Sequence, residues 1–166
     1  MLKPAQLYKE QLNKKYIETW YDKKYMYYQS SPVCYEIQIP DNNECGYNFV
    51  YVNENDDITG YFSYKINWIS KNICNFGLIS FKDNNVAFIR DVIKHIRHML
   101  DDVGIQRIEF WAYKENPANR AYQKLVKKFG GAKVATLHNV NMLSDGRLHD
   151  MVIYEILREN YLEVIK

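Results

Sequence analysis

The stretch from Ser80 to Asp91, SFKDNNVAFIRD, joins a predicted strand to a predicted helix. The residues at 73–81 form a strand-like run, and apolar residues then recur at helical spacing from Val86 to Asp102. A further strand is predicted at 106–113. Because a strand–helix–strand unit requires a crossover, the two strands are expected to be parallel neighbours. Ligands favour the crevice at the carboxyl ends of such strands, and SFKDNNVAFIRD borders that crevice.

The sequence before this crossover predicts antiparallel strands. Side chains alternate with a period of two over 47–52, and the turn NENDDITG leads into the clearest strand of the chain. That strand has one polar and one apolar face, as an antiparallel strand buried on one side does. Its apolar face consists of Phe62, Tyr64, Ile66 and Trp68. With the run that precedes the crossover, these segments predict a three-stranded meander.

The two ends of the chain carry other patterns. Residues 4–21 predict an amphipathic helix, because large apolar side chains recur there every four residues, and a short alternating run follows at 33–39. The C-terminal part predicts a helix that ends at Phe129, and then a hairpin around Asp145-Gly146. The hairpin strands are predicted at 133–143 and 148–157.

The composition indicates one globular domain over 1–166, with an N-terminal part at 1–46 and a core at 47–160. The formal charge of +2, from 22 basic and 20 acidic residues, provides no basic field that favours nucleic acid. The three cysteines form no C-x-x-C pair, which predicts a reducing cytoplasm and neither a disulfide framework nor a zinc site. No window reaches the roughly 18 apolar residues that a membrane span needs.

The order of elements predicts an α/β (α+β) fold, with a mixed, mostly antiparallel central sheet and helices on both faces. The segment KENPANRAYQKLVKKFGG, followed by the Asp145-Gly146 hairpin and the ending RENY, resembles the GNAT acetyltransferases. Within that family it looks like the ribosomal-protein and spermidine-type branch, and the resemblance covers the core at 47–160. It implies the acyl-CoA N-acyltransferase fold. It also implies acetyl transfer from acetyl coenzyme A, as co-substrate, to a primary amine of a small molecule, protein or peptide.

The resemblance assigns a pyrophosphate-binding loop to residues 82–87. In the GNAT family this loop reads Gln/Arg-x-x-Gly-x-Gly/Ala, and its backbone N–H groups bind the pyrophosphate with help from the helix dipole. This chain keeps the spacing as Lys82-x-x-Asn85-x-Ala87. Asparagine is the non-glycine residue that best tolerates a left-handed backbone, which suits Asn85 in place of glycine. Against this function, Asp83 brings a like charge to the phosphates, and Asn84 or Asn85 equally suits an ordinary helix cap.

The resemblance also implies which residues contact the cofactor and which supplies a general acid. Pyrophosphate contacts are expected from Lys82, Asn84, Asn85, Val86 and Ala87, and pantetheine contacts from Ile79, Ser80 and Phe81. Many relatives carry a tyrosine acid seven residues after a helix-starting asparagine. Counting forward from the strand makes that residue Asn116, with Tyr122 six residues on, whereas counting back from KKFGG makes it Asn119 and puts Val126 at the place of the tyrosine. Tyr122 is therefore a candidate general acid, and the alternative is that it only packs on the helix face.

Other side chains qualify as bases or ligands. Glu109 on the second parallel strand is a candidate base, or one half of a cross-strand ion pair. His138 and His149 flank the last hairpin, and a neutral histidine there accepts a proton from an amine. His95 and His98 share the polar side of the first long helix, but no third ligand accompanies them, which indicates a solvated face and no metal site.

The altered loop leaves a second function open, a GNAT-fold binding or interaction module that has lost acetyl transfer. The expected partner is an amine acceptor, with no nucleic acid and no membrane, and the resemblance admits a homodimer. The sequence does not identify the acceptor.

Overall fold

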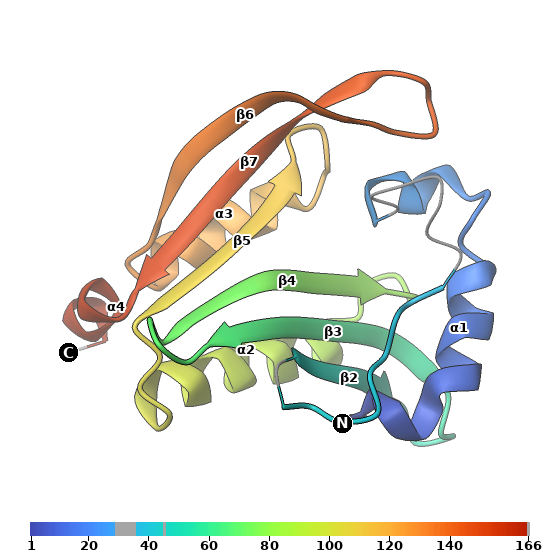
Figure 1. Cartoon of the computed structure of the whole chain (residues 1–166), viewed down its shortest axis with the longest axis horizontal. Coiled ribbons are helices and arrows are strands. Elements are labelled where there is room, and N and C mark those ends of the chain that lie inside the picture. The colour runs from blue at the N-terminus through green and yellow to red at the C-terminus, as the bar shows by residue number, and fades with distance from the viewer. Residues whose placement is uncertain (29–35, 45, 166) are drawn as a thin grey trace.

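The computed structural model describes residues 1–28, 36–44 and 46–165. Within these ranges seven strands form one sheet in the order β1-β2-β3-β4-β5-β7-β6 (Figure 1). The strands are β1 (Leu2–Pro4), β2 (Gly46–Val52), β3 (Ile58–Asn67), β4 (Asn72–Ser80), β5 (Arg107–Tyr113), β6 (Ala132–Met142) and β7 (Leu148–Leu157). The α-helices are α1 (Lys9–Ile17), α2 (Val86–Asp101), α3 (Asn119–Lys128) and α4 (Arg158–Val164), and the 3₁₀ helices are η1 (Ala5–Tyr8) and η2 (Lys23–Tyr28). The predicted mixed, mostly antiparallel sheet is confirmed.

The parallel pair predicted from the crossover is β4 with β5. These strands pair only at their beginnings, where Asn72 faces Arg107 and Ile73 faces Ile108. Figure 1 shows that the two strands then diverge, so that their carboxyl ends lie well apart. The other neighbouring strands in the described sheet pair antiparallel, including the predicted meander β2-β3-β4.

The two faces of the sheet carry separate clusters of buried side chains. The larger cluster joins the sheet to α2, α3 and α4, and it includes Phe62, Phe88 and Phe129. The smaller cluster joins α1 and η2 to the other face, and it includes Leu12, Tyr25 and Tyr61. Helices therefore cover both faces, as predicted, and the alternation along β3 directs its residues to one cluster or the other.

The strand at β3 confirms most of the predicted apolar face. Phe62, Tyr64 and Ile66 are buried, but the strand ends at Asn67 and Trp68 is 51% exposed in the following turn. The assignment of Trp68 to that face is therefore wrong. The reversal into β4 explains the difference, because Asn67 Oδ1 accepts hydrogen bonds from the backbone N–H groups of Ile69 and Ser70 and so ends the extended backbone.

The N-terminal helix is shorter than predicted. Residues 4–21 were expected to be one helix, but Leu2–Pro4 pairs with the free edge of β2 and α1 spans only Lys9–Ile17. The first three residues of the predicted run at 33–39 lie outside the described residues, and its last four form no strand. The sequence interpretation also missed α4, a single short helix that follows β7 directly.

The histidine face of α2 differs from the prediction. His95 is not on a solvated face, because its ring packs edge-on against Phe49 and Phe62 and its Nε2 lies 2.7 Å from the Tyr64 hydroxyl. Burial lowers the pKa of His95, so the imidazole is neutral at neutral pH. His98 is exposed and pairs with Asp102. The described residues contain no group of three or more side chains placed to hold a metal ion, and none of the described helices has the length and apolar character to cross a bilayer.

Candidate active site

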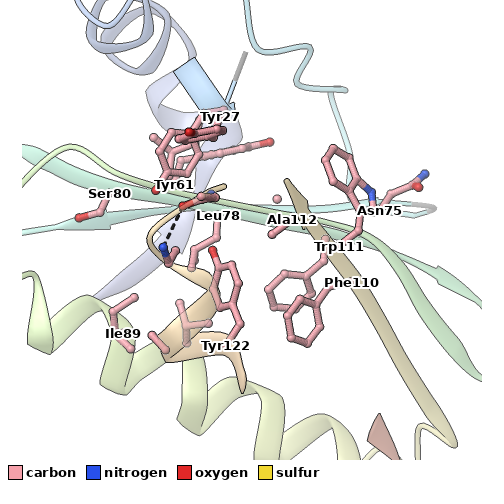
Figure 2. A pocket seen from close by; sticks show the side chains of 18 of the residues that line it. Tyr27, Tyr61, Asn75, Leu78, Ser80, Ile89, Phe110, Trp111, Ala112 and Tyr122 are labelled. Atoms are coloured by element: carbon pink, nitrogen blue, oxygen red, sulfur yellow. Dashed lines mark hydrogen bonds between the residues drawn. The ribbon is translucent and has the colours of Figure 1, made fainter. Parts of the chain in front are cut away.

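A cavity of about 700 Å³ occupies the space between β4 and β5 where these strands separate (Figure 2). Leu78 and Tyr122 line it on the side covered by α2 and α3, and Tyr27 and Tyr61 line it on the side covered by α1. The cavity therefore reaches both faces of the sheet. Its volume is in the range of about 300–1,000 Å³ that small-molecule sites occupy.

The facing edges of β4 and β5 present backbone hydrogen-bonding groups to this cavity. Phe81 donates its backbone N–H to Thr59 of β3, so the alternate residues Leu78 and Ser80 direct their backbone groups to the opposite edge. By the same alternation Lys114 donates to Asp150 beside β7, and Trp111 directs its backbone groups toward β4. The structure thus corrects the expectation for Phe81, whose N–H is already used within the sheet.

A bulge in β4 adds to these backbone groups. Ser63 faces Gly77 and Lys65 faces Cys74, so β4 contains one residue more than β3 between these pairs. Asn75 takes a left-handed conformation there, with φ of 51°, and both Asn75 and Phe76 line the cavity. A bulge leaves its extra residue out of the ladder. The bulge therefore gives the cavity a backbone donor that is not committed to sheet pairing.

The loop between β4 and α2 follows directly after Ser80, which lines the cavity. Its left-handed residue is Asn84, with φ of 51°, whereas Asn85 has φ of −74°. The expectation that Asn85 takes the left-handed place of glycine is therefore wrong by one residue. Asn85 instead donates its side-chain amide to the Thr59 carbonyl at 2.8 Å, and it makes no side-chain cap to α2.

The charge of Asp83 is balanced within the chain. The Lys24 ammonium of η2 forms an ion pair with the Asp83 carboxylate. This contact offsets the like charge that was counted against phosphate binding, although an ion pair between exposed groups is weak. The first-turn N–H groups of α2 form the positive end of a helix of 16 residues. The loop thus combines an anion-favouring helix end with a carboxylate that is in contact with a lysine.

The helix α3 begins at Asn119, so the residue seven positions on is Val126, and the case for Tyr122 depends on where its side chain lies. Asn116 lies in the turn before α3 and accepts the Ala118 N–H at 2.9 Å. Tyr122 lies one turn into α3 and packs edge-on against Phe110 at 5.5 Å between ring centroids. Figure 2 shows its hydroxyl directed into the cavity toward Leu78. Burial raises the pKa of Tyr122, so its phenol is protonated at neutral pH.

Solved structures were compared with this arrangement of sheet, cavity and helix. A point mutant of spermidine N-acetyltransferase SpeG from Vibrio cholerae matches at a TM-score of 0.71 with 15% identity, over 100% of this chain and 99% of that one. A SpeG structure in complex with CoA and spermine matches at 0.68 with 17% identity, over 98% and 97% of the two chains. The chain has the GNAT fold. No protein-family model and no curated protein sequence matches it.

In this GNAT fold, Asn119 holds the end of β5. Its Nδ2 donates to the carbonyls of Tyr113 and Lys114, and its Oδ1 accepts from the Tyr154 hydroxyl at 2.8 Å. Asn119 is buried but does not line the cavity, whereas Asn116 does. Of the pantetheine and pyrophosphate candidates, Ile79 and Ser80 line the cavity directly. Lys82, Asn84, Asn85, Val86 and Ala87 lie in the loop and helix start that follow Ser80.

The candidate bases lie away from the cavity lining. Glu109 accepts a hydrogen bond from Arg107 of its own strand, and Arg107 also contacts Glu155 on β7 at 2.7 Å. Glu109 therefore forms an ion pair within β5, and not the cross-strand ion pair that was its alternative. The His138 side chain is 73% exposed and its Nδ1 lies 3.1 Å from Asp150. The structure does not bring Glu109 or His138 to the cavity.

The cavity contains side chains that sequence reasoning missed. Glu36, Tyr27, Tyr61 and Trp111 line it from the loop before β2, η2, β3 and β5. Glu36 accepts a hydrogen bond from the Gln38 side chain at 2.8 Å. No local motif marks Glu36, and the aromatic cluster KKYMYY is the one signal that pointed to η2.

Proposed function

We propose that this protein transfers an acetyl group from acetyl coenzyme A to a primary amine of a small molecule or peptide. The observation that carries this proposal is the cavity between the diverging edges of β4 and β5. A pantetheine arm carries two amides in an extended chain, and Leu78, Ser80 and Trp111 direct backbone groups to its expected path. The neighbouring SpeG structure, which contains CoA and spermine, supports the same ligand class.

The residues around the loop fit the remainder of the cofactor. The first-turn N–H groups of α2 from Ala87 onward suit a pyrophosphate, because a helix N-terminus favours anions, whereas the Val86 N–H already donates to the Asn84 carbonyl at 2.7 Å. The left-handed Asn84 shapes the loop and exposed Lys82 adds a positive charge beside it. Asn116, from the turn before α3, is the further polar side chain that we assign to the cofactor.

Acetyl coenzyme A would supply the acetyl thioester, and the protein contributes position and electrostatics. The backbone N–H groups at the Asn75 bulge are assigned to polarise the thioester carbonyl, because a fixed donor stabilises developing negative charge. Tyr122 is assigned to donate its phenolic proton to the departing sulfur. Glu36 lies on the opposite wall, where it can accept a hydrogen bond from the incoming amine. No covalent protein intermediate is needed for this chemistry.

Thermal unfolding with and without acetyl coenzyme A tests the proposal. A ligand at 100 times its dissociation constant stabilises the native state by about 2.7 kcal/mol, which corresponds to a rise of about 5–11 °C in the unfolding temperature at this size. No shift at millimolar cofactor would sink the proposal. Asn84→Val should abolish the shift, because a β-branched residue is strained at φ of 51°, and Asn84→Gly should keep it. If the protein binds acetyl coenzyme A but releases no free CoA with any amine tested, the alternative holds: a module that binds the cofactor and does not transfer the acetyl group.

Three accompanying expectations stay predictions. We infer a cytoplasmic location because the three cysteines form no C-x-x-C pair. Cys74 is a free thiol in the described part of the chain. A single domain over 1–166 is carried forward from the composition, and a homodimer from the family resemblance. Sedimentation of the purified chain tests the last of these directly.

A further inference from the structure

Aromatic side chains dominate the α1 side of the cavity, where the acceptor would enter. Tyr61 of β3 and Trp111 of β5 come from the sheet, and Tyr27 and Tyr28 come from η2. These residues are held by further aromatic contacts: Trp111 lies 5.6 Å from the Tyr113 ring, and Tyr27 lies 6.3 Å from the same ring. Figure 2 shows Tyr27, Tyr61 and Trp111 around one end of the cavity. This wall therefore offers several ring faces to a ligand.

Carboxylates are scarce at the same wall. Among the described lining residues, Glu36 is the one acidic side chain. An adjoining cavity of about 640 Å³ shares Tyr61 with this one, and its lining has one acidic and one basic residue, Glu44 and Lys65. The described lining of the first cavity therefore carries one net negative charge, and that of the second carries none.

Three further described carboxylates contact basic groups of the chain, two of them at a single imidazole beside Tyr27. Glu115 and Asp145 both contact the buried His149 ring, each at 3.1 Å. Asp150 contacts Lys114 at 3.2 Å and His138 at 3.1 Å. A second ammonium group in this cavity would have ring faces beside it, but no second carboxylate of the described lining to pair with.

A single ammonium matches what the wall provides. One cation can pair with Glu36, and the ring faces of tyrosine and tryptophan attract a cation or stack on an aromatic body. Burial raises the pKa of Tyr27, Tyr28 and Tyr61, so these phenols are neutral and do not add negative charge at neutral pH. The formal charge of the whole chain, +2, also gives no attraction for a polycation.

We propose that the acceptor is a primary monoamine with an aromatic body, of the arylalkylamine class, and not a polyamine. Its ammonium would lie at Glu36 and its ring among Tyr27, Tyr61 and Trp111. This inference rests on the proposed acetyl transfer. In the reaction the ammonium first loses one proton to solvent, and the amine nitrogen forms a bond to the acetyl carbon. The carbon–sulfur bond breaks, the sulfur takes the Tyr122 proton, and the second proton of the nitrogen returns to Tyr122.

Acceptor choice is tested by release of free thiol from acetyl coenzyme A, with tryptamine, phenethylamine and spermidine compared at equal concentrations. We expect kcat/KM at least 10-fold higher for the arylalkylamines. Calorimetric titration with CoA is performed first, because absence of CoA binding would overturn the proposed function itself. If CoA binds, equal or faster turnover of spermidine, or no turnover of either arylalkylamine, overturns the acceptor class alone.

Two variants test whether the acceptor binds on the aromatic α1 side of the cavity. Tyr27→Leu should raise KM for tryptamine several-fold and leave the Kd of CoA unchanged, whereas Tyr21→Leu, at a side chain that is 96% exposed, should change neither. Glu36→Gln should raise KM for tryptamine, and Glu54→Gln in an exposed turn is its control. An unchanged KM in both Tyr27→Leu and Glu36→Gln would overturn the placement.

Discussion

The side-chain amide of Asn85 donates a hydrogen bond to the Thr59 carbonyl of β3 at 2.8 Å. Asn85 immediately precedes α2, so this bond fastens the start of the helix to the sheet beside the cavity. Because the side chain is turned to Thr59, it does not cap the first N–H groups of α2. An asparagine at this place therefore strengthens the loop and leaves the helix end available for an anion.

Removal of this bond should affect stability and cofactor binding together. Asn85→Ala leaves the Thr59 carbonyl without its side-chain donor, and we expect a loss of about 1 kcal/mol in the free energy of unfolding. CoA affinity should also fall, because the loop is less ordered before binding. Urea unfolding and calorimetric titration measure the two effects. Asn55→Ala, in an exposed turn, is the control and should change neither. If CoA affinity is unaltered in Asn85→Ala, the hydrogen bond to Thr59 stabilises the fold but does not support the cofactor site.

The sequence predicted the elements in which apolar side chains recur at a regular spacing. The alternation along β3 and the helical spacing in α2 each reflect burial of one face, so these elements were predicted near their observed bounds. The crossover correctly predicted that β4 and β5 are parallel. It did not predict their separation, because divergence depends on the bulge at Asn75 and on packing between distant elements.

The site was harder to predict because its contacts join distant residues. His95 looked solvated by residue type, yet Tyr64, 31 residues earlier, provides a hydroxyl partner and a ring. The choice between Asn84 and Asn85 as the left-handed residue depends on the bond to Thr59, which no spacing rule contains. Glu36 reaches the cavity from an irregular segment, where neither periodicity nor a motif applies.

Loss of the Tyr122 hydroxyl should slow turnover without weakening CoA binding. Burial raises the pKa of Tyr122, so the phenol holds its proton at neutral pH and can give it to a thiolate. For Tyr122→Phe we expect kcat to fall about 100-fold, the scale of a lost general acid. Steady-state thiol release gives kcat, and calorimetry gives the Kd of CoA. An unchanged kcat would assign Tyr122 to packing alone.

The control for that experiment is Tyr154→Phe. The Tyr154 hydroxyl donates to Asn119 Oδ1 at 2.8 Å and does not line the cavity. Its removal should lower the unfolding temperature, because a buried asparagine loses a partner. Its effect on kcat should be smaller than that of Tyr122→Phe.

The His149 imidazole should make stability depend on pH. Its ring lies between the Glu115 and Asp145 carboxylates, and although desolvation opposes the charged form, these hydrogen bonds raise the pKa of His149. A raised folded-state pKa stabilises the fold fully below the unfolded value of about 6.5, and the stabilisation is lost as pH rises through the folded value. His149→Leu should therefore lower the unfolding temperature more at pH 5.5 than at pH 9.

Calorimetric scans at the two pH values test this dependence. His138→Leu is the matched control, because that imidazole is 73% exposed and also contacts a carboxylate. An exposed pair contributes little, so this variant should change the unfolding temperature slightly at either pH. An equal effect of His149→Leu at both pH values would mean that the ring contributes only packing against Tyr27 and Tyr113.

Gly130 should show how tightly α4 packs on the end of α3. Gly130 and Gly104 both take left-handed conformations, with φ of 70° and 75°. A Cβ at Gly130 would lie 2.6 Å from the Asn160 carbonyl oxygen, whereas a Cβ at Gly104 would meet nothing within 4 Å. Gly104→Ala should therefore cost about 1 kcal/mol from backbone strain alone. Gly130→Ala adds a contact that only movement of the α4 backbone can relieve, and we expect about 2–4 kcal/mol. Urea unfolding of both variants measures the difference, and equal losses would show that α4 shifts away at little cost.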